Sequence, residues 1–369
     1  MRNPFLSSPP LLPGHGTAHL ALLPPCTPVV ETLTYQYPLK LISPTPLTVT
    51  PKRALTKPVS PHSKSASKGS TDEGAQDEQQ DIARDWLVHT LYTLTYGGGL
   101  VAGDCITLNI TLSALTRLIV LTQGSTKIFK SPSRDVVSRQ DLSVEIGPGA
   151  ALVYLPDPVQ PFERSCFRQA ARYEILPNAG GEDRGSLCVL DWVSRGRAAR
   201  GEEWGFWKYG SRNEIFLVSD KDHEKKRLLL RDNLVLDVGA QEEDVGSVAL
   251  RMDGKGVFGT LILFGSLFEE LGRFFMDEFK ATPRIGSKKW DSGSGDEEEI
   301  TDVEIRRRDR QKQENLDGLL WSAASVRGCV VVKFGAREVE GGRQWIRSML
   351  ETEGTVVDQF GERVLMCLR

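Results

Sequence analysis

The feature that most constrains the fold of this chain is an apolar period of two, which recurs between clusters of Gly, Pro, Asn and Asp. Residues 86–96 alternate and are rich in β-formers, and the apolar residues from Ile106 to Leu112 alternate with polar ones. Such alternation is the pattern of a half-buried β-strand. Further strands are expected at residues 117–122, 142–146, 151–155, 186–193, 213–219, 227–238 and 326–334. The pattern predicts a mainly β fold, as a single large, elongated, many-stranded body of β-helix or sandwich type.

Two stretches have a helical period instead. Apolar residues recur at intervals of three and four at Phe264, Leu267, Phe268, Leu271, Phe274, Phe275 and Phe279, and again at Val339, Trp345, Ile346, Met349 and Leu350. This spacing predicts two α-helices with one apolar face each, the second ended by Gly354. Both faces are expected to pack in the core, and the aromatic excess of the first keeps a groove for a partner as the alternative.

Two segments lack the composition of a folded core. Residues 51–83 are rich in Lys, Ser and Pro and then acidic, and residues 281–315 are rich in Ser, Gly and charge. Both are predicted to be disordered inserts, with a docking or regulatory role as the alternative. The remaining residues, 1–50, 84–280 and 316–369, are expected to form one β domain.

Charge and cysteine usage exclude several classes of protein. The 369 residues hold 46 Lys and Arg against 49 Asp and Glu, a net charge of −3, which excludes a chain-wide basic field for nucleic acid or an anionic membrane. The most apolar long stretch, residues 257–275, contains Glu269, Glu270 and Arg273, so no membrane span is expected. Six scattered cysteines without a Cys-x-x-Cys pair indicate free thiols and a cytoplasmic protein.

The run Gly97-Gly98-Gly99 matches part of a dinucleotide-binding motif, but the continuation after Asp104 alternates as a strand, where such a site needs a helix. The run is therefore expected to be a tight turn between antiparallel strands with Asp104 as a turn residue, or a bend that directs the Asp104 carboxylate into a passage. No nucleophile elbow is present and the five histidines offer few bases. The sequence therefore predicts a protein that is not an enzyme.

The densest group of charged and aromatic residues follows residue 190. It contains Arg195, Arg197, Arg200, Trp204 and Trp207, with Glu202 and Glu203 among them. One interpretation is a bend around residues 196–201 that joins two strands. The other is a docking surface for a protein, because Arg and Trp are common interface anchors. The two glutamates disfavour nucleic-acid binding.

Four stretches carry a resemblance to a known family. They are Tyr96-Gly-Gly-Gly-Leu-Val-Ala-Gly-Asp104, Thr122-Gln-Gly-Ser-Thr-Lys-Ile-Phe-Lys130, Leu155-Pro-Asp-Pro-Val-Gln-Pro-Phe162 and Ser194-Arg-Gly-Arg-Ala-Ala-Arg-Gly-Glu202. In order and approximate spacing, together with a late strand around residues 321–333, the chain resembles the urease accessory protein UreD, also called UreH. The likeness covers roughly residues 11–50, 85–280 and 316–369. The two inserts are additions to the compact bacterial pattern and resemble a eukaryotic, fungal version.

The resemblance implies a non-catalytic scaffold in nickel delivery. Members of the family bind UreF, which recruits the GTPase UreG, and the assembly docks on apo-urease; a dimer of such heterotrimers is one arrangement it allows. The resemblance further implies that nickel passes through the scaffold, with no cofactor held tightly. By motif, Asp104 and Glu202 become the passage-lining carboxylates, because weak oxygen ligands suit transit rather than storage. The alternative is a general β-rich adaptor that uses the Arg/Trp patch and has no role in nickel transfer.

Overall fold

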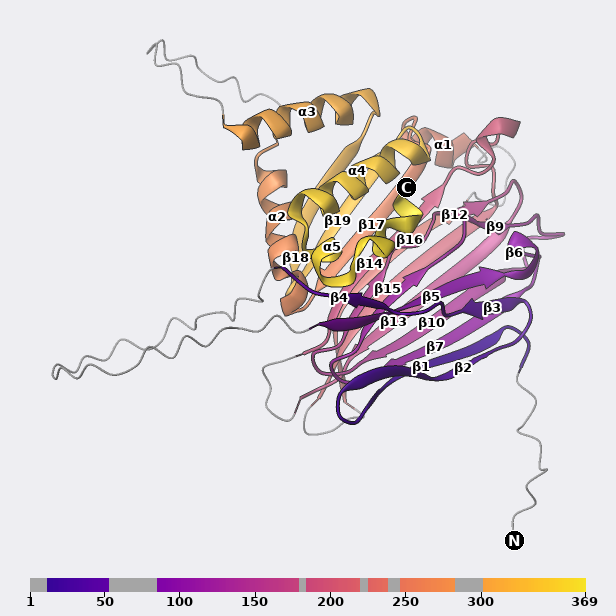
Figure 1. Ribbon diagram of the computed structural model, residues 1–369. Coiled ribbons are helices and arrows are strands. Elements are labelled where there is room, and N and C mark those ends of the chain that lie inside the picture. Colours follow the sequence, from indigo (N-terminus) through magenta and orange to yellow (C-terminus); the bar gives the residue numbers. More distant parts are fainter. Residues whose placement is uncertain (1–11, 53–84, 179–183, 220–224, 238–245, 283–300) are drawn as a thin grey trace, which may run out of the picture.

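The computed structural model describes residues 12–52, 85–178, 184–219, 225–237, 246–282 and 301–369. Two β-sheets face each other, and helices cover the outer face of the second sheet (Figure 1). Most of the two predicted inserts, residues 53–83 and 283–300, lies outside the described residues. Among the described residues, no helix is both long and apolar enough to cross a lipid bilayer.

Sheet A has seven strands, here in spatial order. They are β16 (Lys226–Asp237), β15 (Lys208–Val218), β13 (Cys166–Ile175), β10 (Ser138–Ile146), β7 (Cys105–Leu112), β1 (His15–Leu23) and β2 (Thr27–Tyr35). The four strands from β15 to β7 are parallel to one another, whereas β16 and β2 pair antiparallel at the two edges.

Sheet B has twelve strands. Its main path is β18 (Leu320–Val326), β19 (Cys329–Ala336), β17 (Val257–Phe264), β14 (Ser186–Ser194), β11 (Ala151–Tyr154), β8 (Arg117–Leu121), β5 (Trp86–Thr95) and β3 (Leu39–Ile42). Four short strands branch from this path: β4 (Leu47–Val49), β6 (Gly99–Leu100), β9 (Thr126–Ile128) and β12 (Val159–Pro161). Strands β14, β11, β8 and β5 are parallel.

The chain alternates between the sheets as it advances. It runs from β7 to β8, from β10 to β11 and from β13 to β14, and each turn of this winding adds one parallel strand to each sheet. Strands buried on both faces read as nearly continuous apolar runs, as β8 does, because one face meets sheet A and the other meets the helices. The prediction of a mainly β, β-helix or sandwich-like body is confirmed.

The core has two layers, and β14 contributes to both because successive side chains in a strand point to opposite faces. Leu187, Val189 and Val193 pack between the sheets. Leu190 and Trp192 pack between sheet B and the helices. The prediction that the two helical faces pack in the core is confirmed by the same layer, where Phe275, Trp345 and Trp321 meet.

The helices differ from the prediction in number and bounds. Five α-helices lie among the described residues, where two were expected: α1 (Gly246–Met252), α2 (Glu269–Lys280), α3 (Asp302–Leu316), α4 (Val339–Glu353) and α5 (Thr355–Phe360). Helix α2 begins later than expected, because Phe264 still belongs to β17. Gly354 ends α4 with φ +92°, as predicted, and its N–H bonds to the carbonyl of Leu350 at 2.9 Å.

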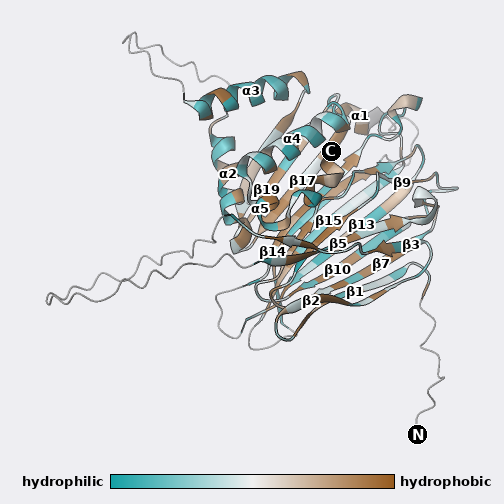
Figure 2. Ribbon diagram, in the orientation of Figure 1, coloured by the Kyte–Doolittle hydropathy of each residue, from teal (hydrophilic) through white to brown (hydrophobic). Residues whose placement is uncertain are grey.

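Helix α3 corrects the prediction that residues 281–315 are disordered throughout. Figure 2 shows that α3 is mostly hydrophilic, so its sequence has no apolar stripe from which a helix could be predicted. Two local features stabilise it instead. Thr301 and Glu304 form a reciprocal capping box, and Arg307 and Arg310 form ion pairs with buried Glu278 of α2. The predicted single strand at 326–334 is also wrong, because Arg327 and Gly328 form a two-residue turn between β18 and β19.

Candidate functional site

The space between the sheets is apolar at both ends and contains a polar band between them. At one end, inward positions hold residues such as Ile146 and Ile175 of sheet A and Leu187 of sheet B. Beyond the band, Phe167, Tyr209 and Val193 are again buried in the apolar core. Within the band, the inward positions of the parallel strands are polar. They are Gln140, Gln169, Ser211 and Asn213 in sheet A, and Tyr154 and Asp191 in sheet B. Since parallel strands keep their register, the polar positions stack into one band across the molecule.

Asp191 is the charged centre of this band. Its carboxylate accepts hydrogen bonds from Gln169 Nε2 and from Asn213 Nδ2, both at 2.6 Å, and a short one from the Ser211 hydroxyl. Desolvation raises the pKa of Asp191, although the three donors oppose that effect. The negative charge of Asp232 adds to the rise. The carboxylate is therefore held in a setting that favours either a proton or a cation beside it.

Two small cavities lie along the polar band, each with a volume of about 40 Å³. They share Thr122, Thr126, Gln140, Leu142 and Tyr154 as wall residues, so they lie end to end between the sheets. Asp191 lines the first of them. A space of this size with polar groups in its walls has room for water.

A second carboxylate, Asp157, lines the same cavity from the loop between β11 and β12. Its Oδ2 accepts from the Thr122 hydroxyl at 3.2 Å and from the Gly124 N–H at 3.0 Å. Its Oδ1 pairs with Arg343 of α4 at 3.0 Å. Asp157 therefore connects the space between the sheets with the helical layer.

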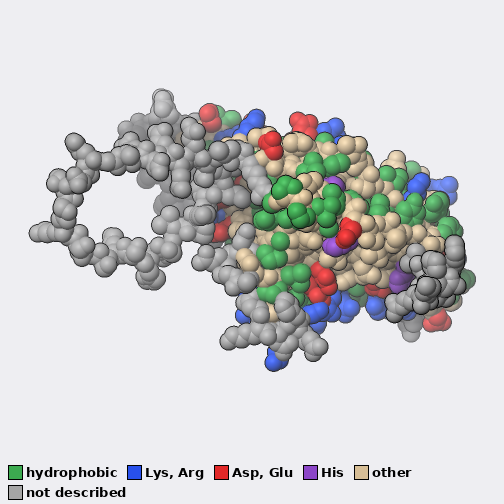
Figure 3. Space-filling view, turned by 60° about the horizontal axis from the view of Figure 1, so that its bottom comes forward, with side chains coloured by type: hydrophobic (Ala, Val, Ile, Leu, Met, Phe, Trp, Pro, Cys, Tyr) green, Lys and Arg blue, Asp and Glu red, His purple; other side chains and the backbone are tan. Residues whose placement is uncertain are grey.

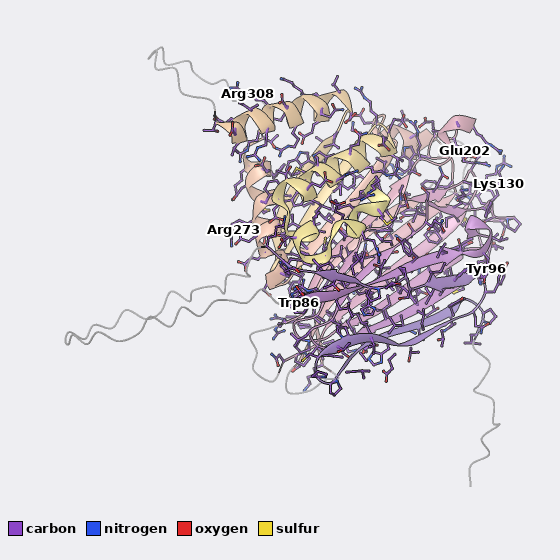
Figure 4. The ribbon with its side chains drawn as sticks, viewed as in Figure 1. Trp86, Tyr96, Lys130, Glu202, Arg273 and Arg308 are labelled. Carbon is purple, nitrogen blue, oxygen red and sulfur yellow. The ribbon has the colours of Figure 1, made fainter. Side chains whose placement is uncertain are left out.

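The four sequence stretches of the resemblance meet at the end of the sandwich beyond the polar band. Strand β6 pairs with β9, β9 pairs with β12, and β12 pairs with β14. These short strands come from the stretches that begin at residues 96, 122 and 155, and the fourth stretch follows β14 directly. In Figure 4, Tyr96, Lys130 and Glu202 lie along one side of the molecule. Segments up to about a hundred residues apart thus build one end of the sandwich.

Asp104 lies in the turn between β6 and β7. Its Oδ2 accepts from the Val101 N–H at 2.8 Å, and its own N–H donates to the Val101 carbonyl at 3.0 Å. The prediction of a turn residue is therefore confirmed, although the turn does not join paired antiparallel strands as expected. Gly97, Gly98 and Gly103 supply the positive φ angles of this connection, between +73° and +86°.

Glu202 is buried in the loop between β14 and β15. It accepts from the Arg197 N–H at 2.9 Å and from Arg197 Nε at 2.8 Å, and Arg197 also lies 4.1 Å above the Phe162 ring. Burial by itself would raise the pKa of Glu202, but the hydrogen bonds and charge of Arg197 outweigh it and hold that pKa below its ordinary value. Neither Glu202 nor Asp104 lines the two cavities between the sheets.

The predicted Arg/Trp docking patch is mostly occupied within the chain. Trp204 is 1% exposed and its indole donates to the Lys255 carbonyl, so the prediction of a surface anchor is wrong for this residue. Arg195 pairs with Glu203 and with Glu338. Arg200 is exposed in the short helical turn of residues 198–200, and Trp207 is half-buried under Arg134. The bend interpretation fits this segment better than the adaptor alternative.

Within the described ranges, no three His, Cys, Asp or Glu side chains converge closely enough to hold a metal ion. On the side of the molecule seen in Figure 3, a histidine side chain lies beside an acidic one. His19 pairs with Glu31 at 2.6 Å. All six cysteines are free thiols, and four of them are buried. The arrangement offers isolated oxygen ligands along a polar cavity, which is suited to brief contact with a cation.

Sequence reasoning missed Asp191 and Asp157. A signal for Asp191 was present: it is the one charged residue in the strand Ser186–Ser194, which is otherwise apolar apart from its terminal serines. A charge in a strand with two buried faces needs partners or a function. Asp157 stood inside a quoted stretch, but no sequence pattern indicated that it would meet Thr122.

The sequence is similar to that of known proteins of one family. Residues 73–362 match the family model described as UreD urease accessory protein. The chain is 28% identical to urease accessory protein 4 of Cryptococcus neoformans var. grubii, over 98% of this chain and 97% of that protein. It is 28% identical to an uncharacterized UreD-like urease accessory protein of Schizosaccharomyces pombe, over 73% and 83% of the two chains. It is 32% identical to urease accessory protein D of Arabidopsis thaliana, over 52% and 59%.

Proposed function

Because the chain belongs to the UreD family of urease accessory proteins, we propose that it is the cytoplasmic scaffold on which UreF and UreG assemble with apo-urease, and that it gives nickel a passage to the urease active site. A role in urease maturation follows from the family, whose members are accessory proteins rather than enzymes. The scaffold contacts and the nickel passage are the proposal.

The observation that carries the nickel passage is the polar band between the sheets. A β sandwich of this size normally fills that space with apolar side chains, as this one does on both sides of the band. Here the space holds a desolvated carboxylate, Asp191, ringed by neutral oxygen and amide groups beside open volume. Oxygen ligands without thiolate or imidazole bind a transition-metal ion weakly, so that an ion which enters can also leave.

Asp104 and Glu202 are proposed as contact points at the end of the sandwich beyond the polar band. They lie in the connections that precede strands β7 and β15 of sheet A. A nickel ion that reaches Glu202 must compete with Arg197, which already holds both carboxylate oxygens. Contact there is therefore brief, as transfer requires.

The scaffold role is tested by co-purification with cognate UreF, UreG and apo-urease, followed by metal analysis of the complex. We expect a stable complex in which this chain joins UreF. Failure of the wild-type chain to associate with UreF under any condition would contradict the scaffold role.

Glu202→Gln and Asp104→Asn test the two carboxylates at the end of the passage. Each variant is expected to lower nickel-dependent urease activation by about tenfold while UreF binding survives, because a carboxylate that meets the ion is lost and the surface is unchanged. Glu203→Gln is the matched control, since this neighbour is exposed and pairs only with Arg195 on the surface. Unchanged activation in both variants would favour the adaptor alternative.

A further inference from the structure

Among the described residues, strand β18 forms one edge of sheet B and pairs only with β19. Its sequence, LWSAASV, contains no charged residue, no proline and no glycine, and its register with β19 is regular over all seven residues. An edge strand of this kind presents a row of unpaired backbone groups to its surroundings and is a template for another strand.

The other edges of the two sheets carry features that discourage such pairing. Strand β2 contains Pro28 and Glu31, and its pairing with β1 is irregular at His19. Strand β3 is only four residues long and is followed by Pro44 and Pro46. Strand β16 has an irregular register with β15 and carries five charged residues: Lys226, Arg227, Arg231, Asp232 and Asp237. Charge, proline, short length and bulges are the usual protections of an edge, and β18 has none of them.

The turn after β18 determines which of its backbone groups are free. Arg327 and Gly328 both have positive φ angles, so the hairpin is closed by a two-residue turn and Val326 and Cys329 form a hydrogen-bonded pair. Because hydrogen-bonded and non-bonded pairs alternate, the N–H and C=O groups of Trp321, Ala323 and Ser325 point away from β19. Nothing in the described part of the chain forms a hydrogen bond to these outward groups.

One face of β18 is open as well. Trp321 and Ala323 are buried against the helices. On the opposite face, Leu320 is 72% exposed and Val326 41% exposed, and Ser322 and Ala324 are exposed between them. The side chains on the open face are thus apolar or small along the whole strand, whereas the exposed side chains of β16 include charged ones.

From these observations we propose that the free edge of β18 is a docking site for an extended, uncharged segment of a protein partner in urease maturation, which adds a strand to sheet B. The inference rests on the function proposed above. Only an extended backbone satisfies the outward groups in register, and the open face selects apolar or small side chains in alternate positions. A second copy of this chain is disfavoured as the occupant, because a seven-residue strand covers far less than the roughly 800 Å² per partner of a stable interface. A partner held by further contacts within the assembly does not need that area from one strand.

Hydrogen exchange with residue-level mass spectrometry tests this docking. The full chain is measured alone and in complex with cognate UreF, UreG and apo-urease. The amides of Trp321, Ala323 and Ser325 are expected to exchange freely in the isolated chain and to slow by at least tenfold in the complex. If the complex forms and urease is activated but these amides exchange as in the free chain, the docking inference is overturned and the scaffold function stands. If no complex forms, the scaffold function and this inference both fall.

Two variants of β18 supply an independent readout. Ser325→Pro removes one outward N–H without touching the pairing with β19, and Ala324→Lys places a charge on the open face. Each is expected to weaken assembly by about tenfold. Asn233→Lys is the matched control, since Asn233 is exposed on the charged edge strand β16. All three variants are first compared with wild type in thermal unfolding. Wild-type affinity in both folded β18 variants would overturn the inference, as would protection of β18 that depends on the concentration of the isolated chain.

Discussion

Asp191→Asn is expected to reduce nickel-dependent urease activation by at least about tenfold while the chain stays folded and still binds its partners. Asp191 is the carboxylate at the centre of the polar band between the sheets, and its neighbours Gln169 and Asn213 are neutral. Asparagine keeps the volume and part of the hydrogen bonding but removes the negative charge that a cation would meet. The measurement is urease activity in a reconstituted activation mixture at limiting nickel.

The matched control for this variant is Glu145→Gln, which removes a carboxylate from the exposed outer face of β10. It is expected to leave activation unchanged. Equal activation by Asp191→Asn and wild type would show that nickel does not depend on the polar band.

The same variant has a stability signature with a defined sign. Burial raises the folded-state pKa of Asp191 above its ordinary value of 3.8, so the protonated form is favoured in the fold. The resulting contribution to stability is present below that ordinary value and is lost as the pH rises through the higher folded-state pKa. The free energy of unfolding of wild type should therefore fall relative to that of Asp191→Asn as the pH rises from about 4. Urea titration at several pH values measures this change.

Glu278→Ala is expected to lower the free energy of unfolding by roughly 3 kcal/mol. The Glu278 side chain is 7% exposed and pairs with Arg307 at 2.8 Å and Arg310 at 2.6 Å. Removing it takes the shared carboxylate from both guanidinium groups of α3, although Arg310 also pairs with Glu314 at 3.1 Å. Breaking a buried pair costs more than the pair contributes. Urea titration measures the loss, and hydrogen exchange in residues 302–316 reports the loosening of α3.

Asp277→Ala is the matched control, one residue earlier on the same helix. Asp277 is exposed and pairs with exposed Lys280, so the loss of this pair should cost at most about 0.5 kcal/mol. A similar loss in both variants would mean that the effect comes from α2 itself and not from the ion pairs with α3.

The Glu278 network also has a pH dependence opposite to that of Asp191. Burial alone would raise the pKa of Glu278, but hydrogen bonds from Arg307 and Arg310 outweigh it, and the pKa lies below the ordinary value of 4.5. Its contribution is therefore fully present above pH 4.5 and is lost as the pH falls through the lower folded-state value. The wild-type protein should approach the stability of Glu278→Ala only in acid.

The sheets were predictable because their signal is local. The alternation from Ile106 to Leu112 predicts both the strand and which of its faces is buried. The helical spacing of apolar residues in the same way predicts the buried faces of α2 and α4. Helix α3 was not, because a capping box and ion pairs to another helix stabilise it and no apolar stripe marks it. The turn at Arg327 was missed because the apolar residues continue on both sides of it.

The candidate site was harder to predict, since it depends on which strands become neighbours. Asp191, Gln169 and Asn213 lie on three strands of two sheets, and nothing in the order of residues places them together. Trp204 illustrates the opposite error. An aromatic residue beside arginines has the composition of an interface, yet its ring is buried and its indole bonds within the chain. Composition describes what a segment could bind, and the fold decides whether it is still available.

The alternate winding of the chain through the two sheets has a consequence for how such a sequence can change during evolution. Loops between strands can gain residues at little entropic cost, because each loop connects only two consecutive strands. A single residue gained or lost inside β14 is another matter. It would exchange the two faces of the strand and place Leu190 or Trp192 where Asp191 now stands. Relatives are therefore expected to differ in length almost only between the strands, and alignment gaps that fall inside β14 should be rare.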